Sequence, residues 1–353
     1  MALEDRVREL AAEVEPADAE ASERAWDLHR RLLKPPGSLG RIEPLGARLA
    51  GIAGETPPPV PENPAVVICA GDHGVLMQGV SPWTREVTAA MVENFCAGGA
   101  AVNALARTVG ALVSVLDVGV ASELEQHPLL RTARVRSGTD DLSEGSAMSR
   151  EEAARAVLAG TGVTEELVES GGVDLLVTGD MGIGNTTPAA CLVAALTARS
   201  AGEVTGRGTG IDDATLGRKT RVVQKALELH DPDPGDPVGV LAALGGLEHA
   251  ALAGVILMGA IYGVPVILDG VVSNSAALVA RSLAPHAEDY LVAGHLSAEP
   301  GARIALDKLG LDPLLDLGMR LGEGTGGLLA VPLVQGAARV MGEMTTLEEA
   351  GIT

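Results

Sequence analysis

Five short apolar segments share one ending, and this repeated pattern constrains the fold more than any other feature of the chain. Each segment is rich in β-branched residues and stops at a glycine beside Asp or His. The segments are AVVICAGDHG (65–74), ALVSVLDVG (111–119), VDLLVTGDMG (173–182), PVILDG (265–270) and DYLVAGH (289–295). Helical patterns, among them 85–107, 151–170 and 241–261, lie between them. Alternating strands and helices predict an α/β fold, Rossmann-like, with a parallel sheet covered by helices on both faces.

The strand ends also predict where a ligand binds. In open parallel sheets, ligands bind beyond the carboxyl ends of the strands. Polar side chains stand at this edge in all five segments, and they are Asp72, His73, Asp117, Asp180, Asp269 and His295. We therefore expect one cleft shared by the five strand ends.

The two ends of the chain are expected to be helical. Apolar spacing predicts helices within 3–33, with a break after Pro16, and over 41–53. The proline-rich stretch 55–64 is typical of a stiff connector. Residues 313–320 and 328–344 are predicted as helices of the C-terminal part. The expected organisation is an N-terminal helical part (1–60), a large α/β domain (61–312) and C-terminal helices (313–353) that return to the N-terminal part.

Charge and cysteine content narrow the function classes. The net charge of −21 argues against nucleic acid and anionic membranes as partners, because both require a basic surface. Cys69, Cys96 and Cys191 lie in apolar contexts without metal-ligand spacing, so free thiols in a reducing compartment are expected. The N-terminus MALEDRVREL predicts no signal peptide. These features together favour a cytoplasmic protein.

The stretch from Ala250 to Leu268 carries no charge and could be mistaken for a membrane span. Gly263 and Pro265 interrupt it. The pattern favours a buried helix, a turn at Tyr262-Gly263 and a buried strand over 264–268.

The glycine-rich turn in LLVTGDMGIGNTTPAAC (175–191) is the clearest candidate for a binding loop. It has no lysine for a Walker loop, and it lacks the third glycine of a dinucleotide fingerprint. Thr187 and Pro188 predict a helix start, and glycine-turn amides at such a start attract an anion. Both a phosphate site and a tight turn without a ligand fit these residues.

Other candidates each have a plainer interpretation. Glu323, between glycines in LGEGTGG, suits a general base or a solvated acid in a connector. Lys219 follows a glycine-rich turn and could reach a phosphate or lie on the surface. Asp212-Asp213 resembles a magnesium-binding pair but follows no strand, and the histidines show no metal-ligand spacing. Ser81-Pro82 predicts a helix start near the cleft.

The motifs together resemble a known family. KPPGSLG, AGDHGV, DVGVA, GDMGIGNTT, LGGLEHAALAG, SAEPGA and LGEGTGG occur in this order. From about Leu32 to Ile352, the chain resembles the nicotinate-nucleotide–dimethylbenzimidazole phosphoribosyltransferases of cobalamin nucleotide-loop assembly. The resemblance implies transfer of phosphoribose from nicotinate mononucleotide to 5,6-dimethylbenzimidazole, which yields α-ribazole 5′-phosphate and nicotinate. It further implies a small helical domain made from both termini and a homodimer without metal or cofactor.

The resemblance also implies roles for individual residues. Glu323 would be the general base. The donor phosphate would be held by the loop and a nearby lysine, namely Gly182, Ile183, Gly184, Asn185, Thr186, Thr187 and Lys219. The nicotinate and acceptor pocket would include Ser81, Asp180, Ser297 and the backbone of Gly326.

Two departures from the family pattern bear on the acceptor. Asp180 stands where the family often has Glu, and Thr84-Arg85 stand where it often has Pro-Gln. The alternatives are therefore a same-fold transferase with another acceptor, such as a different benzimidazole, adenine or a phenol, and a non-catalytic nucleotide-binding protein.

Overall fold

Six parallel strands form the centre of a computed structural model that describes residues 2–352. Their order in the sheet is β3-β2-β1-β4-β5-β6. The strands are β1 (Pro64–Gly71), β2 (Leu112–Gly119), β3 (Leu130–Thr132), β4 (Leu175–Met181), β5 (Val266–Leu268) and β6 (Leu291–Ala293). The predicted α/β fold and all five predicted strands are confirmed. The short edge strand β3, which has the sequence LRT, carries no apolar run and was not predicted.

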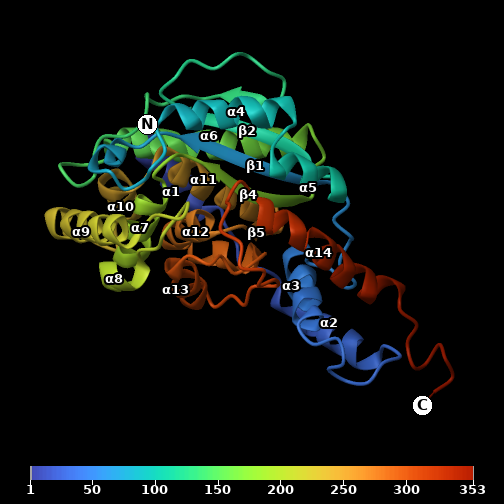
Figure 1. The fold of residues 1–353 in the computed structure, drawn as a ribbon. Helices are drawn as coiled ribbons and strands as arrows, with labels where there is room; N and C mark the ends of the chain where they lie inside the picture. Colours follow the sequence, from blue (N-terminus) through green and yellow to red (C-terminus); the bar gives the residue numbers. More distant parts are fainter. Residues whose placement is uncertain (1, 353) are drawn as a thin grey trace.

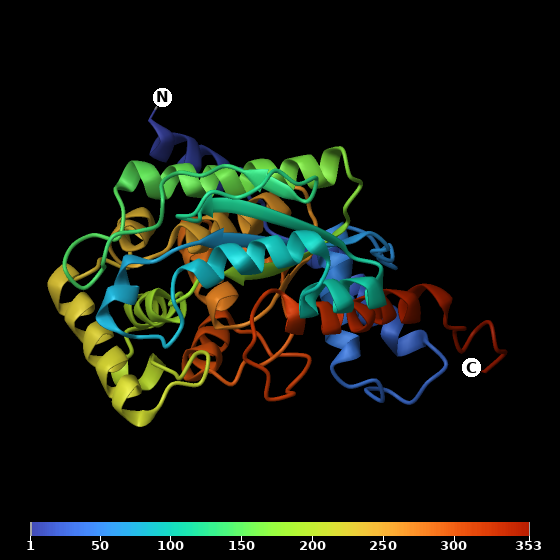
Figure 2. The same ribbon diagram turned by 45° about the horizontal axis from the view of Figure 1, so that its top comes forward.

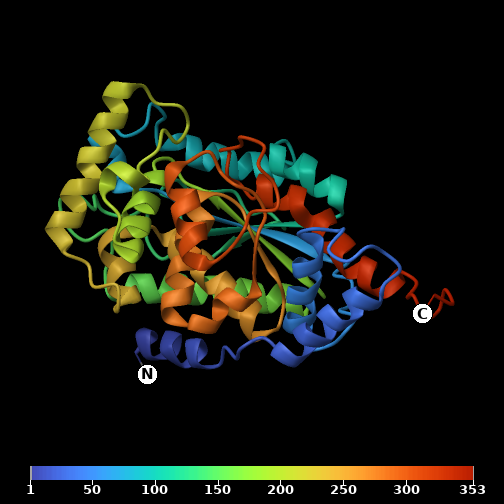
Figure 3. The ribbon, with the colours of Figure 1, turned by 90° about the horizontal axis from the view of Figure 1, so that it is seen from below.

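The sheet is covered on both faces (Figures 1 and 3). Side chains of β1 alternate between two buried clusters: Val67 and Cys69 join one, and Val66 and Ile68 join the other. This alternation follows from the two-residue period of a strand. Helices α6, α11 and α12 cover the first face, and α4, α5 and α14 cover the second. Both faces of the sheet are buried under helices, so its central strands have nearly continuous apolar sequences.

Helix boundaries follow local signals in the sequence. For example, Ser149 and Glu152 form a reciprocal capping box at the start of α6. The helices are α1 (Leu3–Ala12), α2 (Ala19–Arg31), α3 (Ile42–Ala53), α4 (Glu86–Ala97), α5 (Ala101–Val109), α6 (Arg150–Glu169), α7 (Thr186–Thr197), α8 (Ala201–Val204), α9 (Asp213–His230), α10 (Pro237–Leu244), α11 (Leu247–Ile261), α12 (Val271–Leu283), α13 (Pro300–Leu309) and α14 (Thr325–Glu343), with 3-10 helices η1 (Gly74–Gln78) and η2 (Pro285–Tyr290).

Glycines divide two of the predicted helical stretches. The stretch 85–107 is interrupted after α4 at Gly98, whose φ of 78° ends the helix. The stretch 241–261 is interrupted at Gly245 and Gly246, between α10 and α11. The strand predicted after α11 is confirmed as β5. No helix within residues 2–352 has the length and apolar character needed to span a membrane.

Three predictions about helix positions were wrong. Residues 313–320 form no helix, because Leu315 pairs with His295 and the segment forms backbone hydrogen bonds with residues 293–298. Helix α4 begins at Glu86 rather than at Ser81-Pro82, and the Ser81 hydroxyl accepts a hydrogen bond from the Trp83 amide in a turn. Helix α7 begins at Thr186, so Thr187 lies inside the helix instead of capping it.

The ends of the chain meet beside the sheet (Figures 1 and 2). Helix α3 packs against both α2 and α14, although α14 lies near the opposite end of the sequence. Helix α1 packs instead against α6. The contacts of α2, α3 and α14 are consistent with the expected helical unit, whose boundaries at 60 and 313 stay a prediction.

Two glycines allow the close approach of α6 and α11. A Cβ added at Gly160 would lie 1.9 Å from the Ala251 carbonyl oxygen, and one at Gly254 would lie 2.0 Å from that of Val157. Backbone atoms cannot rotate away, so these helices could accommodate a methyl group only by separating.

We predict that Gly254→Ala lowers the free energy of unfolding by about 1–3 kcal/mol, the usual cost of overpacking. Gly162→Ala on α6, the helix that packs against α11, is a matched control, because the added Cβ would meet nothing within 4 Å. That control should be neutral or stabilise by up to about 1 kcal/mol through the higher helix propensity of Ala. Urea unfolding measures both. Equal effects of the two substitutions would contradict the packing account.

Candidate functional site

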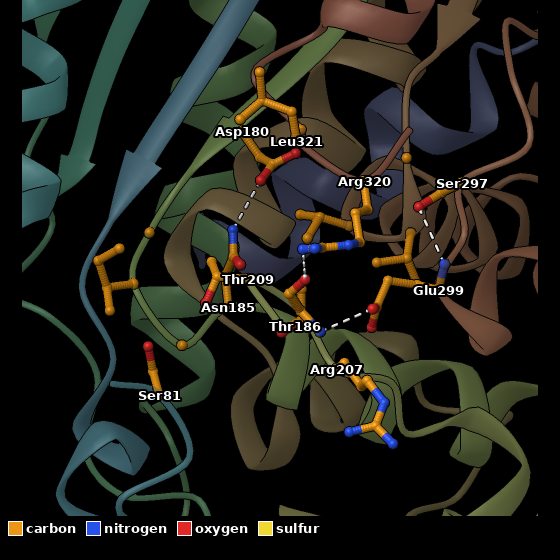
Figure 4. A pocket seen from close by; sticks show the side chains of 18 of the residues that line it. Ser81, Asp180, Asn185, Thr186, Arg207, Thr209, Ser297, Glu299, Arg320 and Leu321 are labelled. Atoms are coloured by element: carbon orange, nitrogen blue, oxygen red, sulfur yellow. Dashed lines mark hydrogen bonds between the residues drawn. The ribbon is translucent and has the colours of Figure 1, made fainter. Parts of the chain in front are cut away.

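A cleft opens beyond the carboxyl ends of β4, β5 and β6. Figure 4 shows Ser81 and Asn185 on one side of it and Ser297 and Glu299 on the other. The lining includes most of the predicted phosphate-binding and pocket residues, namely Ser81, Asp180, Gly182, Ile183, Gly184, Asn185, Thr186, Lys219 and Ser297. Thr187, Glu323 and Gly326 are not among the lining residues.

The shared cleft predicted for five strand ends is correct only in part. The ends of β4, β5 and β6 contribute to it, and Asp180 and His295 line it, but Asp72, His73, Asp117 and Asp269 do not. Their carboxylates accept backbone hydrogen bonds instead: Asp72 from Ala121, and Asp117 from Gly119 and Val120. Asp72, directly after β1, and Asp117, near the end of β2, therefore stabilise the backbone of the turns that follow.

The glycine loop is fixed from both sides. The Ile183 amide donates to the Thr88 hydroxyl at 3.1 Å, and the Asn185 side-chain amide donates to Asp180 at 2.8 Å. Gly184 has φ 92°, a conformation that favours glycine. Helix α7 begins directly after the loop at Thr186, and Asn185 and Thr186 both line the cleft, so the positive end of the helix dipole lies at the cleft. This is the geometry of an anion site at a helix N-terminus.

Lys219 adds a cation to this loop. It comes from α9, its side chain is 1% exposed, and its Nζ donates to the Thr186 hydroxyl at 2.7 Å. Burial lowers the pKa of Lys219 to about 8, and the negative charge of Glu299 opposes this decrease. The surface position that sequence alone left open is therefore wrong, and the ammonium group lies beside the loop.

Glu323 occupies a strained backbone conformation. Its φ is 65°, and those of its neighbours Gly322 and Gly324 are 83° and 87°. A Cβ at Gly179 of β4 would lie 2.7 Å from the Glu323 carbonyl oxygen, so glycine at this position allows the segment to approach the sheet. A non-glycine residue in this conformation costs about 1–2 kcal/mol, and such strain is found at functional sites.

The Glu323 carboxylate is buried and has a raised pKa, which are properties of a proton acceptor. It is buried, and its Oε2 has no hydrogen-bond partner among the residues that the structure describes. Burial, followed by the negative charge of Asp269, raises the pKa of Glu323 to about 7. A carboxyl group with this pKa suits general acid–base chemistry near neutral pH. The solvated connector left open by the sequence is thus excluded.

Asp269 holds the segment that carries Glu323. Its carboxylate accepts hydrogen bonds from the amides of Gly324 (3.1 Å), Gly326 (2.7 Å) and Gly327 (3.0 Å), at the start of α14. His295 Nε2 lies 3.3 Å from the same carboxylate. A carboxylate at a helix N-terminus is favoured by both the free amides and the dipole. Because the Gly326 amide is engaged here, its contact with a nicotinate carboxylate stays a prediction.

Asp180 is a second buried carboxyl group in the cleft. A Cβ at Gly322 would lie 3.2 Å from its Oδ2, so Asp180 lies next to the Glu323 segment. Burial and the charge of Asp269 raise the pKa of Asp180, while the hydrogen bond from Asn185 lowers it. Two nearby acids with raised pKa values are typical of a catalytic site.

Sequence reasoning missed four residues of this region: Thr88, Arg207, Glu299 and Arg320. Arg320 Nη1 donates to the Gly208 carbonyl at 2.7 Å, and Gly208 N donates to Glu299 at 2.8 Å. Arg207 lines the same cleft. The arginines are cations in a strongly acidic chain, and each lies within three residues of a glycine-rich motif, a signal that could have identified them.

Thr84 and Arg85, the departures expected to border the acceptor pocket, are not among the lining residues, whereas Val80 and Ser81 of the same segment are.

Within residues 2–352, no group of three or more His, Cys, Asp or Glu side chains is arranged to hold a metal ion.

Comparisons with known proteins agree with this geometry. A family model described as phosphoribosyltransferase matches residues 14–352. A nicotinate-nucleotide–dimethylbenzimidazole phosphoribosyltransferase of Salinispora tropica is 55% identical over 355 residues, which cover 97% of each chain. One of Chloroflexus aggregans is 53% identical and covers 96% of this chain and 95% of its own. The crystal structure of the enzyme with this name from Thermus thermophilus superimposes with a TM-score of 0.90 at 46% identity, covering 95% of this chain and 99% of its own.

We predict that Asp269→Asn destabilises the fold by about 1–3 kcal/mol, because an amide leaves some of the three backbone donors without an acceptor. Asp307→Asn on α13 is the control, since this acid is exposed and its contact with Arg303 is 3.8 Å long. The control should change the free energy of unfolding by less than about 0.5 kcal/mol. Urea unfolding of both variants measures this, and equal stability would show that the α14 amides do not depend on Asp269.

Proposed function

The chain belongs to the nicotinate-nucleotide–dimethylbenzimidazole phosphoribosyltransferase family, and from this premise we propose how its cleft performs the reaction. The enzyme is a pentosyltransferase of cobalamin biosynthesis. It transfers phosphoribose from nicotinate mononucleotide to 5,6-dimethylbenzimidazole and produces α-ribazole 5′-phosphate and nicotinate. The observation that carries the proposed mechanism is the buried, glycine-framed Glu323, whose backbone lies against Gly179 of β4, shortly before the loop that we assign to the phosphate.

The donor phosphate is assigned to the loop Gly182–Thr187. The N-terminus of α7 and the Lys219 ammonium offer amide donors and a positive charge to one anion. Arg207 and Arg320 line the same cleft and add positive charge. The nicotinate and the acceptor are assigned to the remaining part, with Ser81, Asp180 and Ser297 around them, and the backbone of Gly326 is assigned to the nicotinate carboxylate although it is not among the lining residues.

The bond changes place one demand on the protein. An azole nitrogen of the acceptor attacks C1 of the ribose from the face opposite nicotinate, and the C1–N bond to nicotinate breaks. Its electron pair returns to the pyridinium ring, so nicotinate leaves with a neutral ring and needs no proton. The other azole nitrogen must lose its proton. Glu323, with a pKa of about 7, accepts this proton.

Attack on the face opposite the leaving group converts the β-linked donor into an α-linked product. The leaving group is not a pyrophosphate, so the reaction has no diphosphate for a magnesium ion to neutralise. Asp180 lies beside the Gly322–Glu323 segment and is the next candidate for the base.

Two further expectations stay predictions. The family resemblance favours a homodimer, which sedimentation equilibrium would test. The acidic composition and the unpaired cysteines favour a cytoplasmic location.

The direct test of function is incubation with nicotinate mononucleotide and an equimolar mixture of dimethylbenzimidazole, adenine and p-cresol. Chromatography should reveal α-ribazole 5′-phosphate as the main product. A product from another base and none from dimethylbenzimidazole would overturn the assigned acceptor. Donor binding without any product would favour the non-catalytic alternative.

We predict that Glu323→Gln lowers kcat by about 10²–10⁴-fold, the usual contribution of a positioned general base. In the parental enzyme, kcat/KM should fall about tenfold per pH unit below the Glu323 pKa of about 7, because the protonated carboxyl group cannot accept a proton. The variant should lack this dependence and keep its affinity for the donor.

Steady-state kinetics between pH 5.5 and 8.5 measure both effects. Glu151→Gln, at an exposed position of α6, is the control and should behave as the parental enzyme. A loss of only two- or threefold in Glu323→Gln would exclude this residue as the base. The double variant with Asp180→Asn would then show whether the second carboxyl group has that role.

A further inference from the structure

Glu299 is an acid that lines the same cleft as the cations Arg207, Lys219 and Arg320. It directly precedes α13, lines the cleft and is 6% exposed. In Figure 4 its side chain points toward the region of Thr186 and Arg207. A carboxylate here repels a phosphate, so the mechanism above gives no reason for its presence.

The contacts of Glu299 link it to the loop before α9. Its Oε1 accepts a hydrogen bond from the Gly208 amide at 2.8 Å. A Cβ at Gly206 would lie 2.1 Å from its Oε2, so this backbone packs directly on the carboxylate. Arg320 Nη1 donates to the Gly208 carbonyl at 2.7 Å. Gly208 is therefore held through both of its backbone polar groups.

Glu299 is also the acid that acts on Lys219. Burial lowers the pKa of the lysine, and the charge of Glu299 raises it. The backbone at Gly208 lies close to the lysine as well, because a Cβ there would be 3.6 Å from Lys219 Nζ. One N–H of the Lys219 ammonium donates a hydrogen bond to the Thr186 hydroxyl. The other two N–H groups have no acceptor among the described residues and can donate to a ligand.

The remaining charged groups around Lys219 do not replace Glu299. Cys191 of α7 would raise the lysine pKa only as a thiolate, and burial raises the pKa of this thiol to about 12, so it is neutral near the lysine pKa. Glu203 of α8 is exposed and pairs with Arg199. Helix α10 carries no titratable side chain, and Arg207 and Arg320 bring only positive charge.

We propose that Glu299 is a positioning residue for the donor phosphate: it fixes the Gly206–Gly210 loop and keeps the buried Lys219 in its charged form. The inference rests on the proposed donor site. The carboxylate improves phosphate binding indirectly, by maintaining the cation beside it, even though it repels the phosphate directly.

The charge of Lys219 gives the proposal a signature in pH. The donor phosphate is a dianion above its second pKa of about 6. Donor affinity in the parental enzyme should hold up to about pH 8, the lysine pKa, and fall above it. In Glu299→Gln the lysine loses its proton at lower pH, so affinity declines earlier.

The test measures the binding of nicotinate mononucleotide alone by calorimetry, and its KM and kcat, at pH 6.5 and 8.5. For Glu299→Gln we expect a donor Kd within about threefold of the parental value at pH 6.5. At pH 8.5 we expect it to be about tenfold weaker, which corresponds to a lysine pKa lower by about one unit. At saturating donor, kcat should change little.

Two controls separate charge from packing. Glu203→Gln removes an exposed acid of α8 and should keep the parental profile. Lys219→Met should bind the donor weakly, with the same Kd at both pH values. Circular dichroism at both pH values verifies that each variant is folded.

Three outcomes would overturn the inference. Tighter donor binding by Glu299→Gln would mean that direct repulsion of the phosphate dominates. An equal loss at both pH values would mean that the carboxylate only holds the loop. A parental profile would mean that Glu299 does not act on the donor at all. If the parental enzyme itself binds no donor, the proposed function fails instead.

Discussion

The hydrogen bonds from the start of α14 to Asp269 are the interaction on which the rest of the site depends. Asp269 directly follows β5, whereas the Gly324 amide that donates to it lies 55 residues later. The three amides have no helical partner, so the carboxylate satisfies groups that would otherwise be buried and unpaired. Since Glu323 directly precedes these amides, the same interaction fixes the position of the base. Burial raises the pKa of Glu323, and the negative charge of Asp269 raises it further.

Close backbone approach is the second requirement, and glycines provide it. Gly179 allows the Glu323 segment to lie against β4, and Gly326 allows α14 to lie against the His295 ring, where a Cβ would be 2.0 Å from the ring carbon. The chain has few aromatic residues, two Trp, two Tyr and one Phe, so its core is built from small aliphatic side chains that permit such short distances between elements. The cleft therefore brings α7, α9, α13 and the α14 segment together around one small volume.

The sequence was sufficient for features encoded within a short stretch. The ends of five strands, the loop after β4 and the glycine frame of Glu323 could be recognised because glycine and β-branched residues act locally. The helix predicted over 313–320 was wrong, because the pairing of Leu315 with His295 is tertiary and overrides the local pattern. Lys219 was ambiguous and Glu299 was missed for the same reason: their burial depends on how α9 and α13 pack, which a local pattern does not contain.

Protonation of Glu323 is the property that the account relies on most directly. It is measured by carbon-13 NMR of protein labelled at the glutamate carboxyl carbons, with the Glu323 signal assigned by its absence in Glu323→Gln. The account predicts a titration midpoint near 7, because the carboxylate is buried beside the charge of Asp269. A midpoint near 4.5, the ordinary value for glutamate, would contradict it, since such a carboxylate would be a weak base in contact with water.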